Sequence, residues 1–191
     1  MEHLIIQYLS KYTTITNDLE QAITESASIK SFPKGKILLH EGDISNECYF
    51  ILKGCVRSYY IRDGKEKTTE FFTEEQFILP NQYGTNIPSD HFLECIEEVV
   101  LNISNPNAEK EAFQKYPQLE ILYRKMADII FVNFQKKMDE FRMSSAEQRY
   151  IDLTKERPDL LQRVPQHQIA SFLGISPESL SRIRKRLLKK K

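Results

Sequence analysis

The spacing of apolar residues changes twice along this chain of 191 residues. Residues 1–30 place apolar side chains at helical intervals. Between residues 32 and 103, short apolar runs alternate with glycines at turn-like intervals, and Asp63-Gly64 is a strong hairpin signal. From about residue 108 onward the helical period returns. The pattern predicts an α+β chain, in which N-terminal helices and an antiparallel β jelly roll precede a helical C-terminal part.

The longest helical pattern is expected to open at Pro117, because proline is favoured in a first helical turn, and to run to about Met143. Such a helix is roughly 38 Å long, which is more than a domain of about 100 residues needs. Part of its apolar stripe is expected to pack on its own domain and part on a second copy, which predicts a homodimer. The stripe comprises Leu119, Leu122, Met126, Ile129, Ile130, Phe134, Met138 and Phe141.

The stretch QIASFLGISPESLSRIRKRL, residues 168–187, has the spacing of a helix-turn-helix. Its first helix is expected to start at Pro165, and Gly174 suits the left-handed backbone of a sharp turn. The sequence Ser176-Pro177-Glu178 combines an N-cap hydroxyl, a first-turn proline and an acid near the positive helix end. Small or apolar residues stand at each position where the two helices must meet, namely Ile169, Ala170, Leu173, Ile175, Leu180, Ile183 and Leu187.

The outward face of the second helix carries the candidate DNA-binding residues. Arg182 can bind guanine O6 and N7, and Glu178 can accept a hydrogen bond from cytosine N4. Ser179 and the start of the helix suit phosphate, while the basic residues near the C-terminus add salt-dependent affinity. An alternative for Glu178 is a purely structural acid paired with Arg182, and for the lysines at 189–191 a solvated tail. The candidate set is Gln166, Ser176, Glu178, Ser179, Arg182, Lys185 and Arg186.

The balanced total of 27 basic and 27 acidic side chains hides a division along the chain. Residues 1–141 carry 15 basic and 22 acidic side chains, whereas residues 142–191 carry 12 and 5. This division favours an acidic body joined to a basic module that meets a polyanion, although uneven surface charge is the simpler alternative. The sequence shows neither an apolar run of membrane-spanning length nor a signal peptide, which predicts a cytoplasmic protein without membrane contact.

Cofactor and catalytic chemistry find little support in the sequence. The three cysteines, Cys48, Cys55 and Cys95, are expected to be small buried residues, since their spacing matches no metal-binding motif. The four histidines are scattered and form no His-x-His pair, and no nucleophile is spaced from a base. We therefore expect no metal, no cofactor and no enzyme activity.

With these motifs in order, the sequence resembles the Crp/Fnr family of bacterial transcription regulators. The segments FPKGKILLHEGD, CYFILKGCVRSYY and DGKE resemble its cyclic-nucleotide-binding-type jelly roll, and the long helix and helix-turn-helix follow. The resemblance implies a jelly-roll sensor with N-terminal helices at residues 1–116, a dimerisation helix at 117–143 and a DNA-binding domain at 144–191. It also implies double-stranded DNA and RNA polymerase as partners. Ser144 or Ser145 is the expected cap of the domain's first helix, which Arg157-Pro158 should end.

The sequence departs from the family pattern in three places. Pro177 replaces an arginine of the family's recognition helix, so one expected base contact is missing and the operator is expected to differ from the family's best-known half-site. Few residues separate Pro158 from Gln166, which predicts a reduced or absent β-hairpin wing. Leu79-Pro80 and Pro88-Ser89 stand where cyclic-nucleotide binders carry Gly-Glu and Arg-Ser pairs, so tight cAMP binding is not expected and the effector is open.

Two functions of different classes account for these features. The first is a homodimeric transcription regulator that binds an inverted-repeat operator. The second is a small-molecule sensor whose helical tail docks a protein partner. Salt-dependent binding to specific DNA would separate them. The sequence leaves open the effector, the regulated genes, the sign of regulation, and whether the effector-free form binds DNA.

Overall fold

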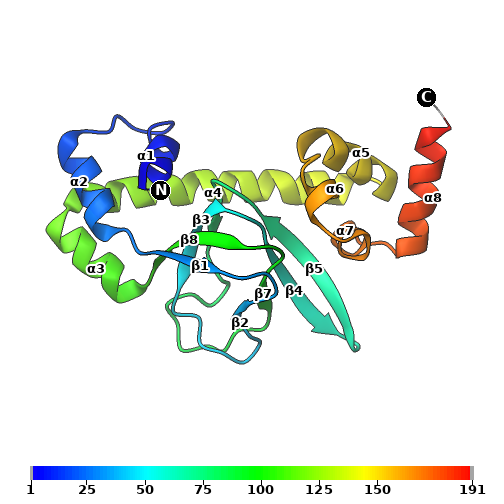
Figure 1. Cartoon of the computed structure of the whole chain (residues 1–191), viewed down its shortest axis with the longest axis horizontal. Helices are drawn as coiled ribbons and strands as arrows, with labels where there is room; N and C mark the ends of the chain where they lie inside the picture. The colour runs from blue at the N-terminus through cyan, green and yellow to red at the C-terminus, as the bar shows by residue number, and fades with distance from the viewer. Residues whose placement is uncertain (1, 190–191) are drawn as a thin grey trace.

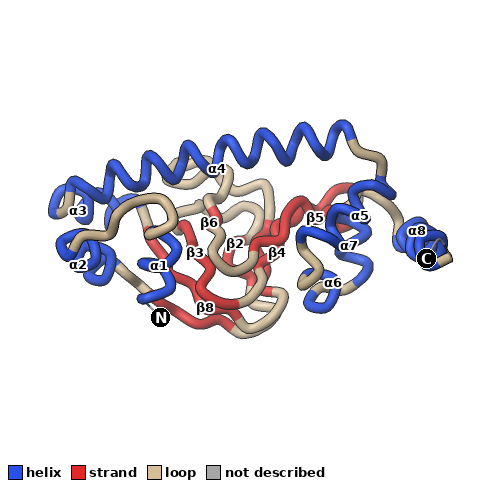
Figure 2. The backbone as a smooth tube through the Cα atoms, turned by 90° about the horizontal axis from the view of Figure 1, so that it is seen from above, coloured by secondary structure: helices blue, strands red, loops and turns tan. Residues whose placement is uncertain are grey.

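One long helix runs along the molecule, and the other elements are grouped beneath and at both ends of it (Figure 1). The computed structural model describes residues 2–189. The N-terminal helices α1 (Glu2–Leu9) and α2 (Asn17–Ser26) lie with α3 (Pro106–Lys115) near the start of the long helix α4 (Pro117–Met143). The remaining helices, at its other end, are α5 (Ala146–Glu156), α6 (Leu160–Arg163), α7 (Gln166–Phe172) and α8 (Pro177–Leu188). Seen from above in Figure 2, α4 forms one side and α8 lies at the far end.

The middle of the chain forms a jelly roll of two four-stranded antiparallel sheets. One sheet has the order β1-β8-β3-β6 and the other the order β2-β7-β4-β5, so β5 is an edge strand. The predicted α+β fold and jelly roll are therefore confirmed. The strands are β1 (Ile29–Phe32), β2 (Ile37–Leu39), β3 (Cys48–Lys53), β4 (Val56–Arg62), β5 (Lys65–Phe72), β6 (Phe77–Ile78), β7 (Phe92–Cys95) and β8 (Val99–Ser104).

Side-chain alternation along the strands separates two apolar layers of the jelly roll. Residues that point between the sheets, such as Ile51 and Leu93, form one buried cluster. Phe50 and Leu52, on the other face of β3, pack against α1, α2 and the first half of α4. Leu119, Leu122 and Met126 of α4 are buried in that second cluster, which fixes the long helix to its own jelly roll.

A third apolar cluster joins the jelly roll to the C-terminal helices. Phe71 of β5 is fully buried, and its ring meets the ring of Phe172 of α7 edge-on at a centroid distance of 5.4 Å. Cys55 and Ile96 belong to the same cluster, together with the buried residues of α5 to α8. The helix-turn-helix therefore shares part of its core with the jelly roll.

Polar contacts strengthen this junction at the open edge of β5. The Thr68 N–H donates to Ser171 Oγ at 2.9 Å, and Arg157 Nη1 donates to the carbonyl oxygen of Phe71 at 2.8 Å. Both backbone groups belong to an edge strand, whose outer side otherwise lacks a strand partner. Arg163 of α6 also bridges to Glu74 and Glu97 of the jelly roll.

Most expected boundaries of the C-terminal helices are confirmed. Helix α4 begins at Pro117 and ends at Met143, and α5 ends just before Arg157. Ser145, rather than Ser144, caps α5 by accepting a hydrogen bond from the Gln148 N–H. The first helix of the helix-turn-helix, α7, was expected to start at Pro165, and this prediction is wrong by one residue. Pro165 has an extended ψ of 139° and stands just before the helix.

The wing prediction is also confirmed for the part of the chain that the structure describes. Between Ser104 and Lys189 all regular elements are helical, and the short helix α6 occupies the segment between Pro158 and Gln166. Within residues 2–189 no helix combines the length and apolar character that crossing a membrane requires.

Candidate nucleic-acid interface

The turn between α7 and α8 is built from Gly174 and Ser176. Gly174 has a φ of 71°, and the N–H groups of Gly174 and Ile175 donate to the carbonyl oxygens of Ser171 and Ala170 at 3.0 Å each. A positive φ suits glycine because it has no Cβ to clash with the neighbouring carbonyl. Ser176 then caps α8, since its Oγ accepts from the Ser179 N–H at 3.2 Å. The predicted helix-turn-helix geometry is present.

Burial fixes which face of α8 is exposed. Leu180 and Ile183 are 2% and 7% exposed and pack on Ile169, Ala170 and Leu173, as expected. The opposite face of α8 is open to solvent, and α8 lies at the extreme end of the molecule (Figure 1). Its exposed residues include Pro177, Glu178, Ser181, Arg182, Lys185 and Arg186.

The structure brings all seven candidate residues to this end of the molecule. Gln166 comes from the first turn of α7, and the other six come from α8 or its cap. Ser179 is half-buried and its N–H is used in the cap, so its part in the site is the N-cap turn. Lys189 is exposed at the end of α8, whereas Lys190 and Lys191 of the predicted basic tail lie outside the described residues.

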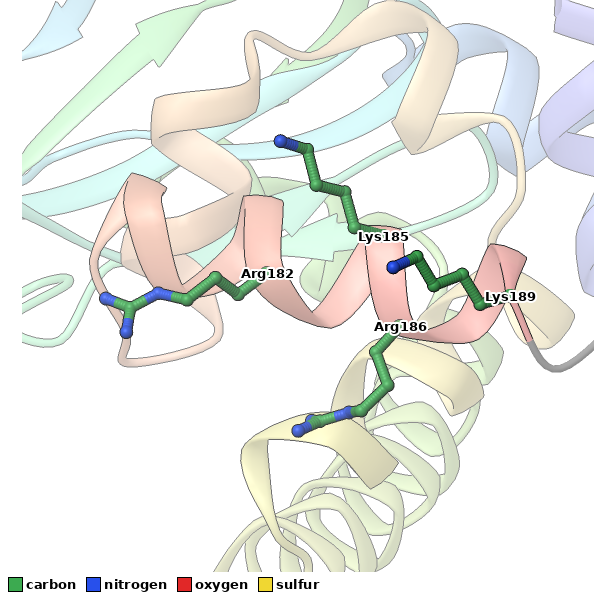
Figure 3. A pocket seen from close by; sticks show the side chains of 4 residues that line it. All are labelled: Arg182, Lys185, Arg186 and Lys189. Carbon is green, nitrogen blue, oxygen red and sulfur yellow. The ribbon is translucent and has the colours of Figure 1, made fainter.

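Four cations gather on one side of α8. Arg182, Lys185, Arg186 and Lys189 line an open hollow of about 400 Å³, and Figure 3 shows all four extending from the same helix. Arg186 turns toward α5, where its guanidinium binds the carboxylate of Glu147. A concave, cationic surface at the end of a helix suits a polyanion.

Glu178 keeps its negative charge in this cationic setting. Hydrogen bonding to Ser176, with the positive charge of Arg182 as a smaller cause, lowers the pKa of the Glu178 carboxyl below its ordinary value. The carboxylate can therefore accept a hydrogen bond from a base amino group at neutral pH. The structural role and the base-reading role of Glu178 remain compatible.

Arg149 of α5 holds the turn in place, a contact that the sequence pattern did not indicate. Its Nη1 donates to the carbonyl oxygen of Ser144 at 2.7 Å, and its Nη2 donates to that of Leu173 at 2.9 Å. The guanidinium also lies over the ring of Phe141, 4.4 Å from its centroid. One side chain thus ties the C-terminal end of α4 to the helix-turn-helix.

The sequence pattern did not predict two further contacts, because each joins residues that only the fold brings together. Arg184 binds the side-chain oxygen of Gln166, and Ser171 binds the edge of β5. The helical spacing places Arg184 beside the exposed face of α8, but its partner lies 18 residues away along the chain. Within residues 2–189, His, Cys, Asp and Glu side chains form no group of three or more that could hold a metal ion.

Comparison with known proteins agrees with this architecture. The sequence profile of the cyclic nucleotide-binding domain family matches residues 29–105. No curated protein sequence matches the chain.

Several solved structures share the fold over most of the chain. A CooA mutant from Carboxydothermus hydrogenoformans is 15% identical with a TM-score of 0.66, over 93% of this chain and 86% of that one. The catabolite activator protein of Thermus thermophilus is 16% identical with a TM-score of 0.57, over 96% and 87%. The c-di-GMP-responsive global regulator CLP of Xanthomonas campestris is 16% identical with a TM-score of 0.66, over 89% and 90%. Residues 29–105 are thus a domain of the cyclic nucleotide-binding type, and most of the chain has the fold of the Crp/Fnr regulators.

Proposed function

We propose that this chain is a sequence-specific transcription regulator that binds an inverted-repeat operator as a homodimer. The observation that carries the proposal is the exposed, cationic face of α8 on a helix-turn-helix scaffold. Residues 1–116 act as the sensor region, residues 117–143 as the dimerisation helix and residues 144–191 as the DNA-binding region. We assign no catalytic role to the chain.

Within the major groove, Arg182 and Glu178 are the base-reading pair. Both are exposed on the side of α8 that faces away from the buried Leu180. The Arg182 guanidinium has the fork geometry for guanine O6 and N7, and the Glu178 carboxylate can accept from cytosine N4. Pro177 has no side-chain donor for a base edge, so we expect α8 to make fewer arginine contacts to its half-site than a recognition helix with an arginine at this position.

Binding to DNA is testable by fluorescence anisotropy with duplexes selected from a random pool. The full chain should select a palindrome with half-site centres about 34 Å apart and bind it more weakly as salt rises. Arg182→Ala should weaken the free energy of binding to the selected site by about 1–3 kcal/mol and relax the sequence preference at one base position. Equal losses on selected and random DNA would remove Arg182 from the base-reading role.

Dimerisation is supported by the second half of α4, where several large apolar side chains have little cover from their own chain. Its apolar side chains remain exposed, with Phe131 at 60% and Phe134 at 56%. Three residues of the predicted apolar stripe, Ile130, Phe134 and Phe141, are among these exposed side chains. A second α4 packed along this stripe would bury it in the manner of a coiled coil.

Sedimentation velocity tests the dimer. Phe134→Glu should shift the chain toward the monomer, because two carboxylates would be buried opposite each other. Gln135→Glu is the matched control, since Gln135 is exposed on the same helix away from the stripe. A Phe134→Glu protein that sediments as the unmodified chain would refute this interface.

The sensor region is proposed not to answer to cAMP. Leu79 and Ser89 stand where cyclic-nucleotide binders carry ribose and phosphate contacts, and the segment between them contains no arginine. Ser89 is buried, and its Oγ donates to the carbonyl oxygen of His91 at 2.9 Å. The buried Arg57 is bound to Glu94 and Glu66, so its charge is already paired. Calorimetry that detects micromolar cAMP binding would overturn this proposal.

The alternative is a small-molecule-binding sensor module whose helical tail docks a protein partner. It predicts no preference among DNA sequences and no palindrome in the selection. The anisotropy experiment on the full chain therefore decides between the two functions.

A further inference from the structure

Helix α8 has a second hollow on the other side of its exposed ridge. This hollow has a volume of about 310 Å³ and shares Lys185 with the cationic hollow described above. Its lining consists of Gln166, Pro177, Ser181, Arg184, Lys185 and Leu188. Residues two apart on a helix differ by about 200° in direction, so Arg184 and Arg186 leave α8 on opposite flanks. The two arginines therefore face different surroundings.

Their partners differ in charge. Arg186 binds the carboxylate of Glu147, so much of its charge is balanced within the protein. Arg184 binds the neutral amide oxygen of Gln166, so it keeps its full charge while its position is fixed. A guanidinium has five N–H donors and an amide NH₂ has two, which leaves this pair with several donors to offer. Among the lining residues of the second hollow there is no carboxylate to compete for them.

An anion with several acceptor oxygens is the complementary ligand. A DNA backbone phosphate has this chemistry, and arginine binds phosphate through short, charge-assisted hydrogen bonds. An α-helix that lies in the major groove directs its ridge at the bases and its flanks at the phosphates of the two groove walls. With its side chains an α-helix is about 10–12 Å across, so the flanks of α8 can reach both walls of a groove about 12 Å wide.

We propose that Arg184, held by Gln166, binds a backbone phosphate on one wall of the major groove and so fixes the register of α8 on its half-site. This inference rests on the proposed DNA binding and names a contact within it. Arg184 is thus a positioning residue that carries no base information, whereas Arg182 on the opposite side reads bases. Arg186 contributes less than its exposed position suggests, because Glu147 holds it.

Duplexes with single uncharged methylphosphonate linkages test the contact. In the selected operator, one such linkage per half-site should weaken binding of the unmodified chain by roughly tenfold. Arg184→Gln should weaken binding to the all-phosphate operator to a similar degree and reduce the salt slope by about 1 per half-site. With Arg184→Gln, the same linkage should cost nothing further, because the two changes remove one interaction.

Three further variants separate the charge from the anchor. Gln166→Glu should resemble Arg184→Gln, since it places a carboxylate on Arg184 as Glu147 does on Arg186. Glu147→Gln should strengthen binding and steepen the salt slope, because it releases the charge of Arg186. Arg62→Gln is the matched control, because Arg62 is an exposed arginine at the end of β4. This variant should leave the affinity for the operator and the salt slope unchanged.

The outcomes distinguish this inference from the proposed function. If the unmodified chain shows no salt-dependent binding to selected DNA, the proposed function fails. If it binds and Arg184→Gln binds equally well, the phosphate contact is refuted while the function stands. The contact is also refuted if Arg184→Gln remains sensitive to the same linkage, whereas loss of that sensitivity supports it.

Discussion

Ser171 offers a sharp test of how the helix-turn-helix is attached to the jelly roll. Its Oγ accepts a hydrogen bond from the Thr68 N–H at 2.9 Å and lies 3.3 Å from the carbonyl oxygen of Glu66. Thr68 is only 5% exposed, so water has little access to its amide. Ser171→Ala removes the acceptor and leaves a buried N–H unpaired, which should lower the free energy of unfolding by about 1–3 kcal/mol.

Urea unfolding followed by far-ultraviolet circular dichroism measures this change. The midpoint should fall with little change in the m-value, at one fixed protein concentration because a dimer's stability depends on concentration. Amide hydrogen exchange should report faster exchange at Thr68. Ser26→Ala is the control, since Ser26 is exposed at the end of α2 and should change stability by less than about 0.5 kcal/mol.

A specific result would refute the reasoning. If Ser171→Ala keeps the stability of the unmodified chain within about 0.5 kcal/mol and Thr68 stays protected, the edge of β5 is not capped by α7 in solution. A second unfolding transition already present in the unmodified chain would likewise show that the helix-turn-helix unfolds apart from the sheet, despite the shared cluster around Phe71 and Phe172.

Three further predictions concern the turn, the junction and the thiols. Gly174→Ala should lower the free energy of unfolding by about 1 kcal/mol from its positive φ alone, because a Cβ there meets nothing closer than 3.8 Å. Gly54→Ala should lower the free energy of unfolding by more, because its Cβ would stand 2.6 Å from a backbone carbonyl oxygen. Urea unfolding compares the two variants. Burial raises the pKa of the Glu74 carboxyl, but hydrogen bonds from Arg163 and from the Gly54 N–H outweigh burial, so the pKa of Glu74 is lowered. The stabilisation from the ionised carboxylate is present above the ordinary carboxyl pKa and should be lost as the pH falls through the lowered pKa. Acid unfolding of Glu74→Gln, compared with the unmodified chain, checks this pH dependence. Native thiols should alkylate far more slowly than unfolded ones at pH 8, because burial raises their pKa values to about 12, 12 and 11 at Cys48, Cys55 and Cys95.

Sequence signals within a few residues of one another were sufficient to predict most of the candidate nucleic-acid interface. The small residue at Ala170, the glycine at 174 and the Ser176-Pro177 start each act within a few residues, so the chain's own spacing predicted the turn and the exposed face of α8. The long helix was predicted with the same bounds, because its period persists over many turns. The start of α7 was misplaced, since proline also occupies the position before a helix, where its extended ψ is allowed.

Contacts between distant segments could not be obtained in this way. Arg184 was identified only as a basic residue, because its partner Gln166 meets it through the packing of two helices. Likewise, nothing in the helix-turn-helix pattern indicated that Ser171 binds the β5 edge, a contact across 103 residues of sequence.

The sequence by itself determined the order of the helical and β regions, the buried face of the helix-turn-helix and the basic end of the chain, because periodicity, capping and charge are local properties. The tertiary structure alone decided which cations are balanced and which remain available. Glu147 lies 39 residues from Arg186, and only the packing of α5 beside α8 brings them together. Gln166 meets Arg184 for the same reason, and it leaves that arginine with its charge. The electrostatics of the candidate interface thus follow from distances across the fold, which a linear pattern of residues does not contain.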